Sequence, residues 1–101
     1  VSAIAGVEVH VYRGGNPFRR VRLKRSPATI GRDAAADVTL DSGHVSRIHA
    51  RLLFDTQTMR LVDAGSTNGT FCGDHELKCE PAVDVATYRL GRMDVKWTPV
   101  D

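Results

Sequence analysis

Apolar and polar residues alternate with a period of two along most of the chain. Five stretches show this pattern: residues 7–12, 20–24, 38–40, 59–62 and 94–98. Successive side chains of a β-strand point to opposite faces, so this period is typical of strands with one buried face and one face in water. The pattern therefore predicts a protein built from many short strands.

Turn-forming sequences separate these stretches at short intervals. Gly14–Pro17, Asp41–Gly43 and Gly73-Asp74 are rich in glycine, proline, asparagine and aspartate, each of which favours a tight turn. Many short strands joined by regular turns are typical of a sandwich or a barrel. We therefore predict an all-β fold, and we predict that residues 1–101 form a single domain.

The segment from Val45 to Phe54 is compatible with two kinds of element. As a short helix it would place Val45, His49 and Leu52 on one face. We favour a strand from about Ala50 to Phe54 over the helix.

Length and composition narrow the class of protein. The 101 residues suffice for one modest hydrophobic core, and 42% hydrophobic with 26% charged residues is the composition of a soluble globular domain. The first residue is Val1 rather than Met, so we expect the domain to be part of a longer multidomain protein. The sequence has no apolar run long enough to cross a bilayer and no signal-peptide pattern, so we expect a cytoplasmic location.

The formal net charge of +2 identifies no class of partner, so any electrostatic function has to come from local clusters. One basic cluster alternates with Val21 and Leu23, which places Arg20, Arg22 and Lys24 on one exposed strand face. A charged sheet edge that resists aggregation explains this face. The alternative is nucleic-acid binding, which we disfavour because exposed aromatic residues do not interleave with the basic ones.

The two cysteines, Cys72 and Cys79, are too few for a disulfide framework or a zinc site. We favour two free thiols, with a single bridge between them as the alternative. We expect neither a metal ion nor a cofactor.

Three loop segments are polar where the strands are not. They are Gly31-Arg32, Ser46–His49 and Ser66–Thr70. Loops at one end of a sandwich lie side by side even when they are far apart in sequence. If these three share an end, they present a guanidinium, two hydroxyls, a carboxamide and several backbone N–H groups around one point. This donor set suits a dianionic phosphate, since arginine offers paired, charge-assisted hydrogen bonds and hydroxyls add single ones.

The order and spacing of these segments resemble the forkhead-associated (FHA) domain family. The resemblance is carried by Ile30-Gly31-Arg32, Asp37–Leu40, Val45–Ala50 and Asp63–Thr70, roughly the middle half of the chain. Each motif alone is common, but the ordered set is specific. The resemblance implies an eleven-stranded β-sandwich whose apical loops bind phosphothreonine in an extended peptide.

The resemblance also implies roles for individual loop residues. Arg32 and Ser46 would bind the phosphate, and Thr67 would add a phosphate contact. Arg47 would contribute a further contact to the phosphate or the backbone. Asn68 would hold the peptide main chain next to the phosphothreonine.

The remaining residues of the motif would set specificity or architecture. His44 lies in a loop that resembles the one reading the residue three positions after the phosphothreonine. Gly31, His49 and Gly69 would be architectural, with His49 bracing the binding loops by hydrogen bonds.

We predict that the domain recognises a phosphothreonine-containing protein, phosphorylated by a Ser/Thr kinase, and so mediates phosphorylation-dependent interactions in signalling or regulation. The alternative is a phosphate-independent scaffold in a larger assembly, such as a secretion-system component or a transcription regulator. Neither reading requires a nucleic acid or a membrane segment.

We do not predict an enzyme. Ser46 and His49 could be read as a nucleophile and a base, but the sequence lacks the Gly-x-Ser-x-Gly elbow and an identifiable orienting carboxylate. It also lacks zinc-ligand spacing and a nucleotide phosphate-binding loop.

Overall fold

The computed structural model describes residues 3–82 and 86–100, and it confirms an all-β fold. Within these residues the chain forms eleven strands and no helix. The described residues therefore contain no helix that could span a membrane. The strands are β1 (Gly6–Arg13), β2 (Asn16–Leu23), β3 (Ala28–Gly31), β4 (Val38–Thr39), β5 (Ala50–Phe54), β6 (Met59–Asp63), β7 (Thr70–Cys72), β8 (His75–Glu76), β9 (Cys79–Pro81), β10 (Tyr88–Leu90) and β11 (Met93–Val100).

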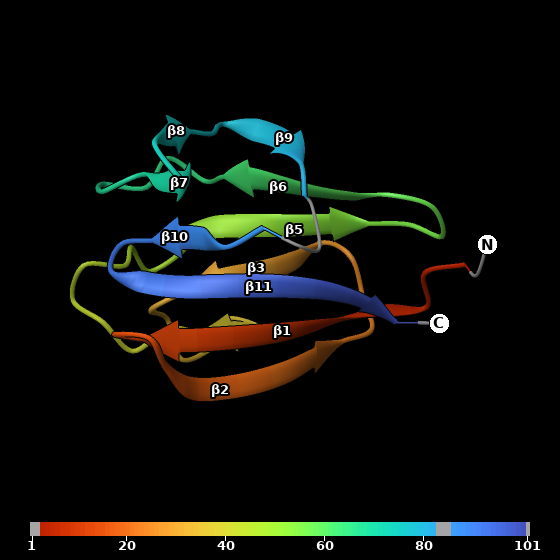
Figure 1. Cartoon of the computed structure of the whole chain (residues 1–101), viewed down its shortest axis with the longest axis horizontal. Helices are drawn as coiled ribbons and strands as arrows, with labels where there is room; N and C mark the ends of the chain where they lie inside the picture. Colours follow the sequence, from red (N-terminus) through yellow and green to blue (C-terminus); the bar gives the residue numbers. More distant parts are fainter. Residues whose placement is uncertain (1–2, 83–85, 101) are drawn as a thin grey trace.

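The strands form a sandwich of two sheets (Figure 1). One sheet has the strand order β2-β1-β11-β10-β7-β8 and the other has the order β4-β3-β5-β6-β9. Among the described residues, every strand pair is antiparallel except β3 with β4. Since β6 and β7 belong to different sheets, the loop between them crosses one end of the sandwich.

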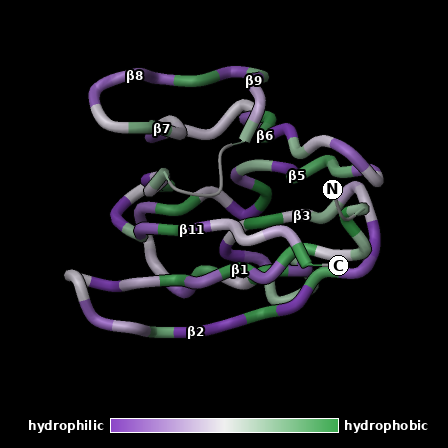
Figure 2. Tube along the Cα trace, turned by 45° about the vertical axis from the view of Figure 1, so that its right-hand side comes forward, coloured by the Kyte–Doolittle hydropathy of each residue, from purple (hydrophilic) through white to green (hydrophobic). Residues whose placement is uncertain are grey.

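The core lies between the sheets and follows the alternation of the sequence. Along β1, Val7, Val9 and Val11 are buried, whereas Glu8 and His10 are only half-buried on the other face. Figure 2 shows this alternation of hydrophobic and hydrophilic positions along the trace. The opposite sheet contributes Ala28, Ile30, Ala50, Leu52, Met59 and Leu61. Burial of these apolar side chains from both sheets is the main force that holds the layers together.

The predicted strands are observed. Each alternating stretch overlaps a strand, namely β1, β2, β4, β6 or β11. The ambiguous segment after Val45 forms the strand Ala50–Phe54, as favoured above, and not a helix. Cys72 and Cys79 are both free thiols, so the alternative of a bridge is wrong.

One end of the sandwich collects the loops that the sequence singled out. The end of β3, the loop between β4 and β5, and the loop between β6 and β7 lie together at the left of Figure 1. The turn between β1 and β2 lies at the same end. The predicted convergence of distant polar segments is therefore present in the fold.

Candidate functional site

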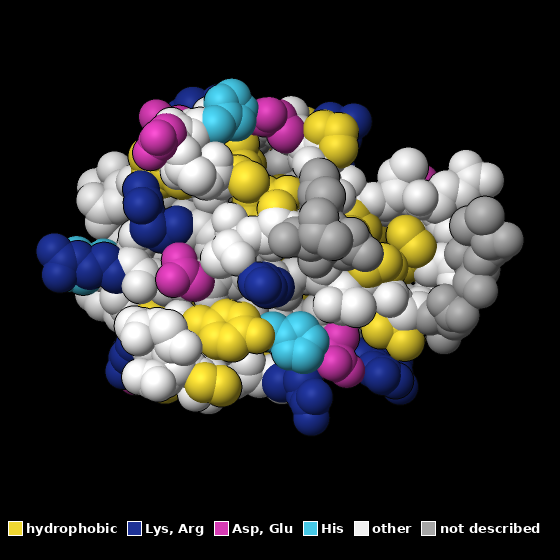
Figure 3. Space-filling model, viewed as in Figure 1, with side chains coloured by type: hydrophobic (Ala, Val, Ile, Leu, Met, Phe, Trp, Pro, Cys, Tyr) yellow, Lys and Arg dark blue, Asp and Glu magenta, His cyan; other side chains and the backbone are white. Residues whose placement is uncertain are grey.

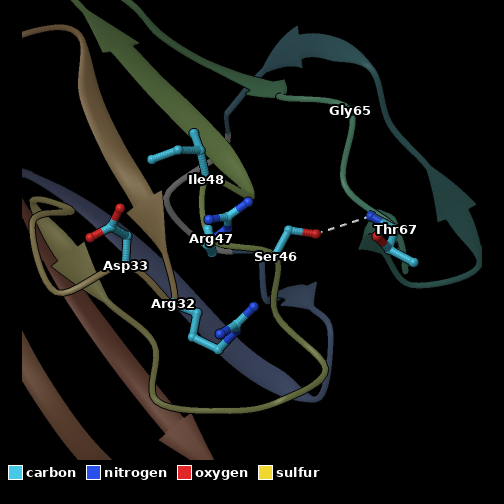
Figure 4. Close-up of a pocket in the computed structure, with 7 residues that line it drawn as sticks. All are labelled: Arg32, Asp33, Ser46, Arg47, Ile48, Gly65 and Thr67. Atoms are coloured by element: carbon cyan, nitrogen blue, oxygen red, sulfur yellow. Dashed lines mark hydrogen bonds between the residues drawn. The ribbon is translucent and has the colours of Figure 1, made fainter.

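Three polar segments surround one open pocket at this end of the sandwich (Figure 4). The pocket has a volume of about 500 Å³ and is lined by Arg32, Asp33, Ser46, Arg47, Ile48, Gly65 and Thr67. Four of the five residues implied as ligand-binding are therefore brought together. The fifth, Asn68, follows Thr67 in the chain but does not line the pocket.

Arg32 directly follows β3, and its guanidinium is held in place from one side. Its Nε donates a hydrogen bond to the backbone oxygen of Val45 at 3.0 Å. The two terminal nitrogens make no hydrogen bond or ion pair with the described residues. The side chain is thus oriented by Val45 and keeps its forked pair of donors for a ligand.

Gly31 is required because two backbones approach closely. A Cβ at this position would lie 2.1 Å from the backbone oxygen of Arg47. The close approach allows the N–H of Arg32 to donate to Ser46 O at 2.9 Å and that of Asp33 to donate to Arg47 O at 3.1 Å. The end of β3 therefore holds the loop between β4 and β5 directly against the pocket.

Ser46 and Thr67 join the two loops across the pocket. The backbone N–H of Thr67 donates to Ser46 Oγ at 3.0 Å (Figure 4). Because Oγ is the acceptor in this bond, the hydroxyl proton of Ser46 is still available to a ligand. The Thr67 hydroxyl makes no hydrogen bond with the described part of the chain. Both hydroxyls can therefore donate into the pocket.

His49 is fully buried behind the pocket and contacts both loops. Its Nδ1 accepts the backbone N–H of Ser46 at 3.1 Å, which makes Nε2 the protonated nitrogen. Nε2 then donates to the backbone oxygen of Gly69 at 2.8 Å. Since the ring uses both nitrogens on backbone groups, it supports the loops and does not face a ligand.

Asp63, at the end of β6, organises the loop that carries Thr67. This role of Asp63 was not predicted from the sequence. Its carboxylate accepts hydrogen bonds from the N–H groups of Gly65 and Ser66 and from the hydroxyls of Ser66 and Thr70. Partial burial raises the pKa of the Asp63 carboxyl, but these hydrogen bonds outweigh burial and hold the pKa below its usual value. The sequence signal that could have identified this role of Asp63 is an aspartate followed by several small polar residues, a pattern typical of a turn held by the aspartate side chain.

The same loop turns sharply at Gly69, whose φ is 84°. A side chain at this angle is strained, and a Cβ would also lie 2.8 Å from the Phe71 ring. The Gly69 N–H is held by Ser66 Oγ at 3.1 Å. This turn brings the Gly69 carbonyl to His49 and leaves Thr67 and Asn68 at the exposed tip.

Asn68 and His44 lie beside the pocket and are linked to each other. Asn68 Nδ2 donates to the backbone oxygen of His44 at 2.7 Å. Asn68 Oδ1 has no partner among the described residues, so it can accept a peptide N–H. The exposed His44 ring makes no hydrogen bond or ion pair with the described residues. Both residues thus keep side-chain groups that can contact a ligand beside the pocket.

The pocket carries more positive than negative charge. Arg32 and Arg47 contribute two guanidiniums, and the exposed Arg47 makes no ion pair with any described residue. Asp33 is the one carboxylate in the lining; it was missed by the sequence analysis and lies on the opposite side from Thr67 (Figure 4). The balance favours an anionic ligand near Ser46 and Thr67.

The geometry does not form a nucleophile–base pair. The His49 ring contacts the backbone N–H of Ser46 rather than its hydroxyl, and the ring's other nitrogen contacts a carbonyl. Activation of a serine requires the base to bond the hydroxyl itself. In the described ranges, no group of three or more His, Cys, Asp or Glu side chains could hold a metal ion.

Comparison with known proteins identifies the family of this chain. Residues 28–87 match the family model of the FHA domain. The glycogen accumulation regulator GarA of Mycobacterium tuberculosis is 36% identical over an alignment of 78 residues, which covers 69% of this chain and 48% of GarA. The chain thus spans about half the length of this curated relative.

Two solved structures share the whole fold at 27% and 28% identity. The first comes from a structural and functional analysis of phosphothreonine-dependent FHA domain interactions, with a TM-score of 0.84 over 95% of this chain and 98% of that one. The second is the FhaA FHA domain complexed with the intracellular domain of Rv3910, with a TM-score of 0.81 over 91% and 99%. The motifs, the fold and the family match agree, and this chain belongs to the FHA domain family.

Proposed function

We propose that this domain recognises phosphothreonine in an extended segment of a partner protein and so mediates a phosphorylation-dependent interaction. The observation that supports the proposal is the convergence of Arg32, Ser46 and Thr67 on one open pocket, where the terminal nitrogens of Arg32 and the two hydroxyl protons are not used by hydrogen bonds within the described residues. A phosphothreonine carries a charge of about −1.5 to −2 near neutral pH and three strong acceptor oxygens. The donors and the surplus positive charge match both properties.

Each residue has a distinct role in this proposal. Arg32 neutralises the phosphate with its forked terminal nitrogens. Ser46 and Thr67 each donate one hydroxyl hydrogen bond and so orient it. Arg47 adds charge from the rim, and the free Oδ1 of Asn68 accepts an N–H of the peptide main chain. His44, joined to Asn68, contacts a side chain further along the peptide.

The relatives support one class of partner. An FHA structure at 27% identity comes from work on phosphothreonine-dependent interactions, and GarA is named a regulator. These names support a regulatory domain that binds phosphoproteins rather than an enzyme. We further propose that the phosphorylated residue of the partner is a threonine and that a Ser/Thr kinase phosphorylates it.

Removal of the Arg32 side chain tests the site. A charge-assisted hydrogen bond contributes about 1.5–3 kcal/mol, so Arg32→Ala should weaken binding of a phosphothreonine peptide by about tenfold or more. Isothermal titration calorimetry, with a peptide selected from a phosphothreonine library on the wild-type domain, measures this directly.

The matched control is Arg51→Ala, which removes an exposed arginine from β5, outside the pocket lining. This variant should bind the peptide as the wild type does. Unchanged affinity in Arg32→Ala would contradict the site assignment. Equal affinity of the wild type for phosphorylated and plain threonine peptides would instead indicate a phosphate-independent scaffold.

A further inference from the structure

The first two strands form a basic pole of the molecule. Residues 6–25 contain six basic and one acidic side chain, a formal charge of +5, whereas the whole chain sums to +2. The remainder of the chain therefore sums to −3. Such asymmetry attracts a partner of opposite charge to one face.

Neighbouring groups do not neutralise this charge. The carboxylate of Glu8 is shared by His10 at 3.2 Å, Arg20 at 3.8 Å and Arg22 at 3.4 Å. One carboxylate balances one guanidinium, so a positive surplus is left on the outer face of β1 and β2. Lys and Arg side chains gather along the lower edge of this face, over β2 (Figure 3). The Arg20 side chain is 69% exposed and accessible to a partner.

A hollow with an aromatic wall adjoins the basic side chains. It has a volume of about 360 Å³ and is lined by His10, Val11, Tyr12, Pro17, Phe18, Arg19 and Arg20. Phe18 is 38% exposed, and its ring centroid lies 4.7 Å from the Arg13 guanidinium carbon and 5.9 Å from that of Arg19. The ring is thus held at the surface by two cations instead of being buried in the core.

The hollow lies on a free sheet edge that is connected to the loop end. β2 is the outermost strand of its sheet, so one side of its backbone has no strand partner in the described part of the chain. Arg13 stacks on Phe18 and also donates from Nη2 to the backbone oxygen of Asp41, in the loop that leads to Ser46. A partner segment on this edge would therefore lie against the same loop that lines the pocket.

We propose that the β1–β2 edge is a second binding surface, which takes an acidic, extended segment of a protein partner. The segment's backbone pairs with the free side of β2. Its carboxylates face Arg20 and Arg22, which lie opposite His10 and Glu8 on the outer face, and an apolar side chain on its other face enters the hollow beside Phe18. A protein fits better than a nucleic acid, because the guanidiniums of Arg13 and Arg19 already contact the ring on which a base would stack.

An unphosphorylated peptide tests this surface independently of the phosphothreonine pocket. The probe is a fluorescein-labelled peptide of about eight residues, the length of β2, in which glutamate alternates with valine. Fluorescence anisotropy at low ionic strength should show binding that weakens with added salt. Arg20→Glu/Arg22→Glu should raise the Kd by about tenfold or more, because two attractive charges on the outer face become repulsive.

Three comparisons make the test specific. Arg51→Glu/Arg60→Glu changes the net charge equally but on exposed positions of β5 and β6, and it should bind the probe as the wild type does. The Arg20→Gln variant, at an exposed position, should give a smaller loss in the same direction even if the double variant does not fold. Arg32→Ala should leave binding of this probe unchanged, so the outcome does not depend on the phosphothreonine proposal.

The proposal is overturned by any of three results. One is equal loss of binding in both double variants, which would show that binding depends on the net charge of the domain and not on the β1–β2 edge. Another is equal binding of a probe in which glutamine replaces glutamate. The last is a double-stranded DNA oligonucleotide that binds the same edge more tightly than the peptide does.

Discussion

Several single residues at the loop end each hold two segments together. Ser46 accepts a bond from Thr67, Asn68 donates to His44, and His49 joins the backbones of both binding loops. Each of these bonds joins one protein group to another and needs no ligand atom. Bonds of this kind orient the loops, which lowers the ordering cost that a ligand has to overcome.

His49 gives the clearest test at this scale. His49→Phe keeps a ring of similar shape but leaves the Ser46 N–H and the Gly69 carbonyl without their partner. A buried group without a hydrogen bond costs about 1–3 kcal/mol, so we expect the free energy of unfolding to fall by about 2 kcal/mol or more. Urea denaturation followed by Trp97 fluorescence measures the change.

The control for this substitution is His75→Phe, because the His75 side chain is 64% exposed and, among the described residues, is hydrogen-bonded only to Glu80. It should change stability by no more than about 0.5 kcal/mol. Equal stabilities of the two variants would show that the bonds of His49 to the loops contribute little.

The sequence predicted the residues that line the pocket better than some of the groups that surround them. Arg32, Ser46 and Thr67 could be found because their order and spacing form a motif. The carbonyl of Val45 and the carboxylate of Asp33 could not, because a backbone oxygen leaves no mark on the sequence and a single loop aspartate is commonplace. Their positions depend on how β3 packs against the next loop.

At the scale of elements, the loop between β6 and β7 depends on one charged group. Asp63 holds it through four hydrogen bonds, which lower the pKa of this carboxyl below the usual 3.8. A lowered native pKa adds stability that is complete above the pKa of the unfolded chain. That stability is lost as the pH falls through the native pKa.

Asp63→Asn should therefore destabilise the domain in a pH-dependent way. Near neutral pH the variant loses charge-assisted bonds and should be less stable by about 1–3 kcal/mol. Below about pH 3.8 the gap to the wild type should narrow, because the wild-type carboxyl also becomes neutral. Urea denaturation across the acidic range, with Asp74→Asn in the exposed turn as the control, measures the gap; a gap that stays constant would contradict this account.

The strands themselves were predictable to different degrees. β1 and β11 alternate clearly because one face of each is buried over a long span. β2 is exposed over most of its length, and it alternates only near its end, where Val21 and Leu23 turn toward the core. β8 and β9 are two and three residues long and largely exposed, so they carry no such pattern. Their extended form depends on pairing with β7 and β6, which is a tertiary effect. The number of strands accordingly came from the family resemblance and not from the pattern.

At the scale of the whole molecule, the fold separates stability from binding. The apolar residues of both sheets form one core, which includes the fully buried Trp97, while the pocket is built from loops at one end. The loops are tied to the core through β3, β6 and the buried His49. Ligand binding is therefore expected to stabilise the native state as a unit rather than to reorganise it.

This coupling gives a quantitative expectation for thermal unfolding. A ligand that binds only the native state stabilises it by about 2.7 kcal/mol at a concentration 100 times its Kd. For a domain of about 100 residues, this corresponds to a rise in Tm of about 10 °C or more. Differential scanning calorimetry should show this rise with a phosphothreonine peptide and no rise with its unphosphorylated form. In Arg32→Ala the same peptide concentration should give about half that rise, since a tenfold weaker ligand contributes about 1.4 kcal/mol less. Equal shifts in both proteins would mean that the stabilising ligand binds elsewhere on the sandwich.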